Sequence, residues 1–233
     1  DNNTNGTELR IVDCRSRMAA LGNKLAHGAG VESRDHGYET CHVEHQDMPN
    51  IHAVSASFAQ LTELCSSGTH RAAAASKPSW LKDLESTGWF EQLGYLLAAA
   101  ERLVVAMGVD RISCLVHCSD GWDRTTQLVS LAALLLDPYY RTIAGFSVLV
   151  EREWVRMGHQ FSERSGHRIY SSHVGVGSAV TEQKDVSPIF VQWLDAVWQV
   201  MRQFPTAFEF NEDLLVLLGS EVYSCRFRTF AFD

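Results

Sequence analysis

One stretch of the sequence constrains the fold more than any other. An apolar, strand-like run over 112–116 precedes Cys118, and Arg124 follows six positions later, where a strongly helical segment begins. Gly121 lies between them and permits a tight bend. Backbone amides of a loop between a strand and a helix N-terminus converge on one concavity, and the helix dipole adds to their attraction for anions. The stretch therefore predicts a phosphate-binding loop.

The residue types of this loop predict nucleophilic chemistry on the phosphorus. The field that holds an anion also favours the thiolate of Cys118, which is the form of cysteine that attacks. The planar guanidinium of Arg124 can hold two phosphate oxygens, and Thr125 can donate a hydrogen bond to the sulfur. Expulsion of an alcohol needs a general acid, and the loop contains Asp120 and Asp123. We favour Asp123 for that role.

A cysteine and an arginine at this separation also occur by chance, so the spacing alone is weak evidence. The strand before the loop, the helix after it, the glycine within it and the threonine beside the arginine make the prediction much more specific. Strand-like runs at 9–12, 41–45 and 112–116 are each followed by a helical pattern. This alternation predicts an α/β fold in which helices flank a central sheet.

Composition narrows the class of protein. The chain has 233 residues and a formal net charge of −8, which argues against non-specific nucleic-acid binding. Its longest apolar runs are too short to span a bilayer. The six cysteines are scattered without a C-x-x-C pair, which favours a reduced, cytoplasmic protein. His159, His167 and His173 fit no zinc spacing, so we expect solvated loop histidines and no metal site.

Local patterns predict the remaining elements and their ends. We expect helices over about 13–25, 50–64, 90–104, 124–137, 141–158, 188–204 and 211–218. Asp13, Ser187 and Asn211 are the expected helix caps, with Pro188 at the first helical position. Gly145 is expected to interrupt its helix. A linker is expected over 66–79, and a polar surface loop over 163–187.

The loop sequence His117-Cys118-Ser119-Asp120-Gly121-Trp122-Asp123-Arg124-Thr125 resembles the signature of the myotubularin family of lipid phosphatases. Further blocks resemble the family in the same order along the chain. They include Asn50-Ile51-His52, Leu84-Glu85-Ser86-Thr87, Asp137-Pro138-Tyr139-Tyr140-Arg141, Glu153-Trp154, Ser187-Pro188, Arg202-Gln203-Phe204-Pro205 and Phe208-Glu209-Phe210-Asn211-Glu212. The resemblance covers nearly the whole chain and implies a cysteine-phosphatase fold. Residues 1–233 would then be the C-terminal portion of the catalytic domain, without the family's N-terminal lipid-binding module.

The resemblance also implies an activity. Family members remove the 3-phosphate of phosphatidylinositol 3-phosphate and phosphatidylinositol 3,5-bisphosphate at endosomal membranes, without a metal or organic cofactor. A cytoplasmic protein, peripheral to those membranes, would be expected. Its partners would be the phosphoinositide headgroup and, through regions outside this chain, a second family member in a homo- or heterodimer.

The site residues carry over by position. Cys118 would be the nucleophile, Arg124 the phosphate-binding arginine and Asp123 the acid. The headgroup pocket would be lined by Ser119, Asp120, Gly121, Trp122 and Thr125, with Asn50 and Arg164 approaching the inositol ring.

Several interpretations remain open at this stage. Asn50 could instead cap the helix that follows it, and Arg164 could pair with Glu163 or Asp185 on the surface. Gln160 stands where many family members have a basic residue, so acceptance of a 5-phosphate is open. A protein tyrosine phosphatase would use the same loop chemistry. A non-catalytic adaptor of the same family is the alternative from another class, and the presence of Cys118, Asp123 and Arg124 disfavours it.

Overall fold

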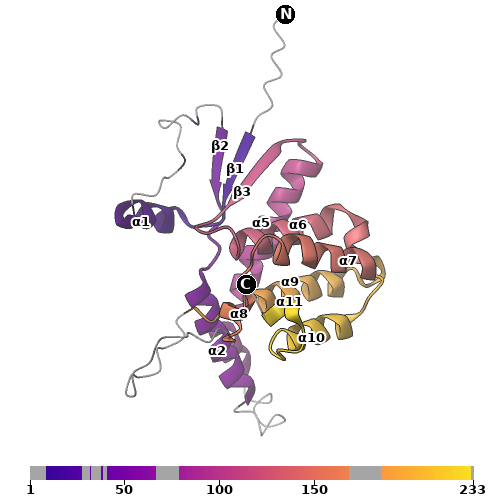
Figure 1. The fold of residues 1–233 in the computed structure, drawn as a ribbon. Helices are drawn as coiled ribbons and strands as arrows, with labels where there is room; N and C mark the ends of the chain where they lie inside the picture. The colour runs from indigo at the N-terminus through magenta and orange to yellow at the C-terminus, as the bar shows by residue number, and fades with distance from the viewer. Residues whose placement is uncertain are drawn as a thin grey trace, which may run out of the picture.

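Three short parallel strands form the sheet, with β1 (Leu9–Asp13) between β2 (Cys41–His45) and β3 (Ser113–His117). Leu9 pairs with Cys41 and Ser113 at one end, and Asp13 pairs with His45 and His117 at the other. The carboxyl ends of all three strands therefore meet along one edge (Figure 1). The computed structural model describes residues 9–27, 32, 38, 41–66, 79–167 and 185–231.

Helices make up most of the described chain. Those near the sheet are α1 (Arg17–His27), α2 (Ile51–Ser66), α4 (Trp80–Ser86), α5 (Trp89–Gly108) and α6 (Arg124–Leu136). The later ones are α7 (Ile143–Val150), α8 (Phe161–Arg164), α9 (Ile189–Gln203), α10 (Glu212–Glu221) and α11 (Arg228–Ala231). Single turns lie at η2 (Pro138–Arg141), η3 (Glu151–Val155) and η4 (Pro205–Ala207). The expected α/β class is confirmed as a small parallel sheet with many helices.

The core lies among α5, α6 and α9, away from α1 (Figure 1). Leucines and alanines at helical spacing bury one face of α5, and α9 buries the larger side chains Phe190, Trp193 and Val197. Trp154 from η3 contacts Phe190 and Trp193 with ring centroids 4.8 and 5.2 Å apart. Aromatic packing of this kind fixes the position of the helices that follow the Cys118 loop.

The apolar run over 112–116 predicts a buried strand, but β3 is partly buried, on one side only. Cys114 and Val116 are half-buried on the side where α5 and α6 contact the strand, whereas Ser113 is exposed and Leu115 is 49% exposed. A short apolar run predicts burial on both faces of a sheet, so the sequence pattern did not predict the exposure of Leu115. In the described part of the molecule, β3 is an edge strand, and α5 and α6 contact it on the side of Cys114 and Val116.

Two of the three expected caps are wrong. Asp13 is the last residue of β1, and Ser16 accepts the Ala19 amide at the start of α1. Ser187 donates its hydroxyl to the Ile51 carbonyl oxygen at 2.7 Å instead of capping α9. Asp13 instead accepts hydrogen bonds from Arg15, two residues along, whereas Ser187 is taken by a partner distant in the sequence. Asn211 is confirmed, since its side chain accepts the Asp213 amide at 3.1 Å.

Gly145 does not interrupt its helix, because α7 continues through it. The glycine is required for another reason. A Cβ atom at this position would lie 1.8 Å from the Tyr139 carbonyl oxygen, so only glycine allows α7 to approach the preceding turn.

The two irregular segments have different outcomes. Within 163–187, the first residues belong to the buried α8 and are not a surface loop, while 168–184 lie outside the described residues. Most of the expected linker, 67–78, also lies outside them, and α4 was not anticipated.

Among the helices that the structure describes, none combines the length and apolarity needed to cross a bilayer.

Candidate active site

The loop from Cys118 to Arg124 connects the carboxyl end of β3 to the N-terminus of α6. Gly121 has a φ of +95°, a conformation that favours glycine, and its amide donates to the Cys118 sulfur at 3.2 Å. The Arg124 guanidinium donates to the Ser119 hydroxyl at 3.1 Å. The loop thus curls around the cysteine, and a backbone amide of the loop points at its sulfur.

A cavity of about 240 Å³ opens beside this loop. Four parts of the chain line it: the loop itself, the segment from Arg15 into α1, the start of α2, and α8. The lining residues are Arg15, Ala19, Asn23, Asn50, Ile51, His52, Cys118, Ser119, Asp120, Asp123, Arg124 and Arg164. Seven of the ten residues predicted from the sequence therefore meet at one cavity.

The other three predicted residues lie elsewhere. Gly121 and Thr125 face a neighbouring, mainly apolar cavity of about 350 Å³ between β3, α5 and α6. Trp122 contributes its backbone carbonyl to His159 and does not line the first cavity. The Thr125 hydroxyl makes no hydrogen bond to the Cys118 sulfur. The amide of Gly121 occupies the donor role that we expected of Thr125.

Asp123 is held by two cationic or polar partners. Arg164 forms a two-pronged ion pair with it, with N–O distances of 2.9 and 3.1 Å, and His159 Nδ1 lies 3.2 Å from its carboxylate. Burial alone would raise the pKa of Asp123, but the hydrogen bonds from His159 and Arg164 outweigh burial and hold that pKa below its ordinary value. The carboxylate is therefore ionised at neutral pH in the empty site.

Arg164 and His159 are not the exposed side chains that local sequence suggests. Both are buried, and Arg164 also donates to the Asp185 carbonyl oxygen and lies 3.4 Å from Glu163. Arg164 therefore contacts Glu163 and Asp185, as the sequence suggested, but it is buried and its main partner is Asp123. The expectation of a solvated loop histidine is wrong for His159, which packs against Trp154 at a centroid distance of 4.8 Å.

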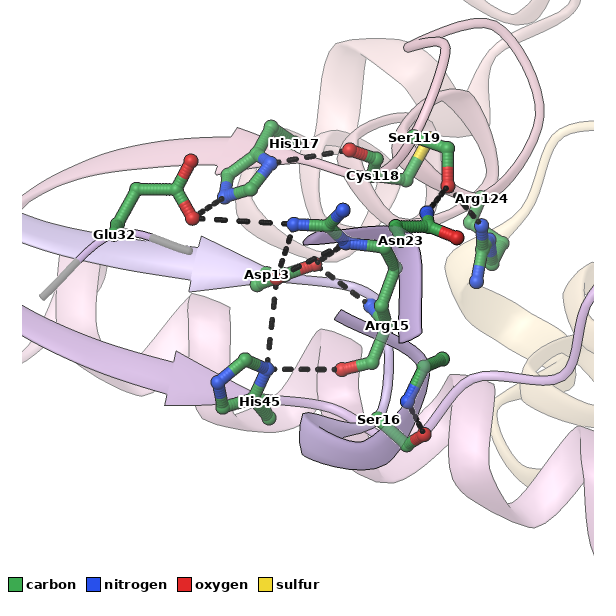
Figure 2. Close-up of polar contacts among 11 residues, drawn as sticks. Asp13, Arg15, Ser16, Asn23, Glu32, His45, His117, Cys118, Ser119 and Arg124 are labelled. Carbon is green, nitrogen blue, oxygen red and sulfur yellow. Dashed lines mark hydrogen bonds and ion pairs between the residues drawn. The ribbon is translucent and has the colours of Figure 1, made fainter. Parts of the chain in front are cut away.

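A charged network lies behind the loop, along the carboxyl edge of the sheet (Figure 2). Arg15 forms hydrogen bonds of 2.8–3.1 Å to the buried carboxylate of Asp13, and that carboxylate also lies 3.5 Å from His45. His117 lies between the Cys118 carbonyl oxygen, at 3.2 Å, and the carboxylate of Glu32, at 3.5 Å. His117 thus makes a structural hydrogen bond beneath the loop.

Asp13, Glu32 and His117 could by geometry hold a metal ion. The Arg15 guanidinium, however, lies 2.8 Å from Asp13 and 3.9 Å from Glu32, so a cationic group already compensates these carboxylates. The hydrogen bonds to Asp13 raise the pKa of Arg15 further. The network therefore fits a role in positioning β1 against the loop better than a role in metal binding.

Asn50 combines both of its possible roles. Its side-chain oxygen accepts the Ala53 amide at 2.9 Å, as a helix cap does, while the residue also lines the cavity. Arg15 and Asn23, which were not predicted as site residues, line the same cavity, and Asn23 donates to Ser119 at 3.3 Å. Their positions just beyond the end of β1 were the available signal, because the carboxyl ends of parallel strands share one edge.

Comparison with known proteins agrees with this site. The family model described as "Myotubularin-like phosphatase domain" matches residues 1–233, which is the whole chain. The chain belongs to this family. The matched range includes the Cys118 loop.

Named relatives are similar over nearly the whole chain. Human phosphatidylinositol-3,5-bisphosphate 3-phosphatase MTMR4 is 46% identical over 96% of the chain, and Xenopus tropicalis myotubularin is 42% identical over 100%. Human phosphatidylinositol-3,5-bisphosphate 3-phosphatase MTMR8 is 41% identical over 95%. The chain spans 17%, 36% and 29% of the lengths of these relatives.

Proposed function

We propose that this protein is a cysteine-dependent phosphoinositide 3-phosphatase that hydrolyses phosphatidylinositol 3-phosphate. The observation that carries the proposal is the convergence of Cys118, Asp123, Arg124 and Arg164 on one cavity within a myotubularin-like phosphatase domain. Relatives named for 3-phosphatase activity on the 3,5-bisphosphate support the lipid headgroup as substrate and make that lipid the second candidate. We infer a cysteine-phosphatase fold and peripheral association with endosomal membranes.

The proposed reaction has two steps. The Cys118 thiolate attacks phosphorus, the bond to the inositol oxygen breaks, and a cysteinyl-phosphate intermediate forms. Water then attacks phosphorus and releases inorganic phosphate and the thiolate. Arg124 and the loop amides stabilise the equatorial oxygens in both transition states, and the Gly121 amide stabilises the sulfur as it leaves.

Protonation of the departing inositol oxygen is the step that needs explanation. Asp123 is our candidate for the acid, yet hydrogen bonds from His159 and Arg164 hold its pKa below the ordinary value and keep it ionised. A phosphate dianion bound next to Asp123 is a like charge that raises its pKa and competes for Arg164. Substrate binding would then favour protonation of Asp123, which is the form that can act as the acid. Asp120, exposed in the same cavity, is the competing candidate.

Phosphate release from a panel of phosphoinositides tests the proposal. We expect hydrolysis of phosphatidylinositol 3-phosphate, no activity after Cys118→Ser, and a loss of at least about a hundredfold after Arg124→Ala, because phosphate loses its guanidinium clamp. Gln160→Arg would reveal whether a basic residue improves use of the 3,5-bisphosphate. Faster hydrolysis of a phosphotyrosine peptide would overturn the lipid assignment, and activity after Cys118→Ser would overturn the nucleophile.

A further inference from the structure

The exposed side of α1 carries three apolar side chains on consecutive turns. Met18 is 79% exposed, Leu21 is 47% exposed and Leu25 is 82% exposed. Their separations of three and four residues place them in one stripe along the helix. Single exposed apolar residues are normal on protein surfaces, but an aligned group indicates an interaction surface. We call these three residues the apolar stripe.

The rest of α1 fixes where the apolar stripe points. At 3.6 residues per turn, the stripe lies opposite Ala20, which is fully buried against the protein. Ala19 and Asn23, which line the cavity of the candidate active site, lie on the same side of the helix as Ala20, away from the stripe. Exposed Arg17 and Lys24 flank the stripe. Figure 1 shows α1 standing apart from the helical body, beyond the carboxyl ends of the strands.

We propose that the apolar stripe inserts into the surface of an anionic lipid bilayer and holds the cavity against the membrane. This inference rests on the proposed function, because a phosphoinositide headgroup is anchored in the bilayer by its acyl chains. A protein that binds the headgroup must bring the rim of its cavity to the membrane surface. The stripe and the cavity wall lie on opposite faces of α1, so insertion of the stripe would keep the cavity within one helix diameter, ~10–12 Å, of the membrane.

The charges near α1 suit this occupant. Interfacial helices bury an apolar face about 5–10 Å deep and place basic residues at the headgroups. The chain as a whole carries a net charge of −8 and is repelled by an anionic surface. Arg17 and Lys24 on α1 supply the local positive charge that offsets this repulsion. An anionic bilayer therefore matches both the apolar stripe and its basic flank. An acidic protein surface without apolar residues would match only the basic flank.

The test is a double variant, Leu21→Gln with Leu25→Gln. Both residues are exposed and outside the cavity lining, so we expect the fold to survive. Binding is measured by co-sedimentation with vesicles of phosphatidylcholine and phosphatidylserine. The vesicles are prepared with and without phosphatidylinositol 3-phosphate. We expect binding and turnover of the vesicle substrate to fall about tenfold or more. Turnover of a soluble, short-chain phosphatidylinositol 3-phosphate is expected to stay within about twofold of the parent protein.

The matched control is Val216→Gln with Leu217→Gln, two exposed apolar residues on α10. We expect no change in binding or in either turnover. Equal vesicle binding by the stripe variant and the parent would overturn the proposal, as would an equal loss with the soluble substrate. Concentration-dependent self-association that the variant abolishes would instead assign the stripe to a second copy. Failure to hydrolyse either lipid would refute the proposed function, while binding to substrate-free anionic vesicles would still test the stripe.

A second, independent observation concerns the buried Cys14. It follows Asp13, which pairs with His117 across neighbouring strands, and its amide donates to the His117 carbonyl oxygen at 2.8 Å. Cys14 and Cys118 are thus the first residues beyond the paired ends of β1 and β3, neighbouring strands that lie about 4.8 Å apart. A disulfide needs Cα atoms roughly 4.4–6.8 Å apart. Burial and the neighbouring Cys118 raise the pKa of Cys14, so it is a neutral thiol at rest.

We propose that Cys14 protects Cys118 from irreversible oxidation by forming a reversible disulfide with it. Hydrogen peroxide is the oxidant: an S–O bond forms at Cys118, the O–O bond breaks, and hydroxide leaves. Cys14 then attacks the resulting sulfenic acid, an S–S bond forms, and the oxygen departs as water with the Cys14 proton. A dithiol restores both thiols and becomes a disulfide itself.

Peroxide treatment followed by dithiothreitol tests this pair. In the parent protein we expect a peptide linking Cys14 to Cys118 by mass spectrometry, and recovery of most activity. Cys14→Ala is expected to recover several-fold less, with Cys118 found as sulfinic acid. Cys114→Ala, on β3 but four residues from the nucleophile, is the control and should recover as the parent does. Absence of the linked peptide, or equal recovery in all three proteins, would overturn the proposal. The mass measurement does not depend on the substrate assigned above.

Discussion

At the scale of single residues, the ion pair between Asp123 and Arg164 connects the loop to α8 across 41 positions of sequence. Both side chains are largely removed from water, so each is costly to leave without the other. The pair places a cation beside the cavity and keeps Asp123 ionised until an anion arrives. Position and protonation of the candidate acid therefore depend on long-range contacts with His159 and Arg164.

Removing the arginine exposes that dependence. We expect Arg164→Gln to lower the free energy of unfolding by about 3–5 kcal/mol at pH 7, since it leaves a buried, unpaired carboxylate. The pKa of Asp123 is lowered in the folded protein, so its contribution is present at neutral pH and lost as the pH falls through that pKa. The deficit of the variant should therefore shrink between pH 7 and pH 3, as measured by urea unfolding.

The control is Arg226→Gln, which removes an exposed arginine paired with Glu221 at 2.9 Å. Exposed pairs contribute about 1 kcal/mol or less. An equal cost for both variants, or a deficit for Arg164→Gln that does not change with pH, would show that the pair does not behave as a buried ion pair.

The choice between Asp123 and Asp120 as acid is open to a test with two leaving groups. General acid catalysis contributes about 10²–10⁴-fold when the leaving group is an alcohol and little when it is a good leaving group such as p-nitrophenol. We expect Asp123→Asn to reduce kcat on the lipid at least about a hundredfold and on p-nitrophenyl phosphate far less. Asp120→Asn should reduce both rates to a similar degree. The reverse pattern would identify Asp120 as the general acid.

At the scale of elements, the junction between η2 and α7 depends on one glycine. Thr142 accepts the Gly145 amide at 3.0 Å and caps α7, while the Tyr139 carbonyl occupies the space of a Cβ atom. The helix can therefore start only because residue 145 has no side chain. The same contact explains why a glycine at this position does not break the helix.

Alanine at this junction should be costly. We expect Gly145→Ala to destabilise the protein by about 2–4 kcal/mol, because α7 or the turn must shift to admit the Cβ atom. Gly94→Ala, on the exposed side of α5 with open space around it, should stabilise by about 0.5–1 kcal/mol through helix propensity. Thermal unfolding of both variants gives the comparison. A neutral effect of Gly145→Ala would contradict the close approach.

At the scale of the whole molecule, aromatic packing joins the C-terminal end of the chain to the active-site side. Phe230 from α11 contacts Phe161 from α8, with ring centroids 5.0 Å apart, and Phe161 lies three residues before Arg164. The helix that supplies Arg164 is thus supported by the last helix that the structure describes. Loss of this packing should affect both stability and catalysis.

We expect Phe230→Ala to cost about 3–5 kcal/mol, since it opens a cavity beneath α8. It should also lower kcat, because Arg164 would no longer be held against Asp123. Phe204→Ala, at an exposed position after α9, should cost less than about 1 kcal/mol and leave kcat unchanged. Calorimetry and turnover on the soluble lipid measure both effects. A normal kcat in a folded Phe230→Ala protein would contradict the proposed dependence of Arg164 on the packing of α11.

The sequence by itself determined the features that depend on neighbouring residues. The strand before Cys118, the bend at Gly121, the helix from Arg124, the existence of three strands and the Asn211 cap follow from residue type and spacing, and the structure agrees with them. The same local information placed Cys118, Asp123 and Arg124 in one loop. Short-range backbone and side-chain preferences are sufficient for such features because they act within one or two turns.

Only the tertiary structure decided which distant side chains meet at that loop. Arg164 binds Asp123 and is not a surface residue, His159 is buried, Arg15 and Asn23 join the cavity, and Ser187 binds Ile51. It also left Leu115 and the apolar stripe exposed. The partner of a side chain depends on how separate elements pack, and local periodicity carries no information about that packing.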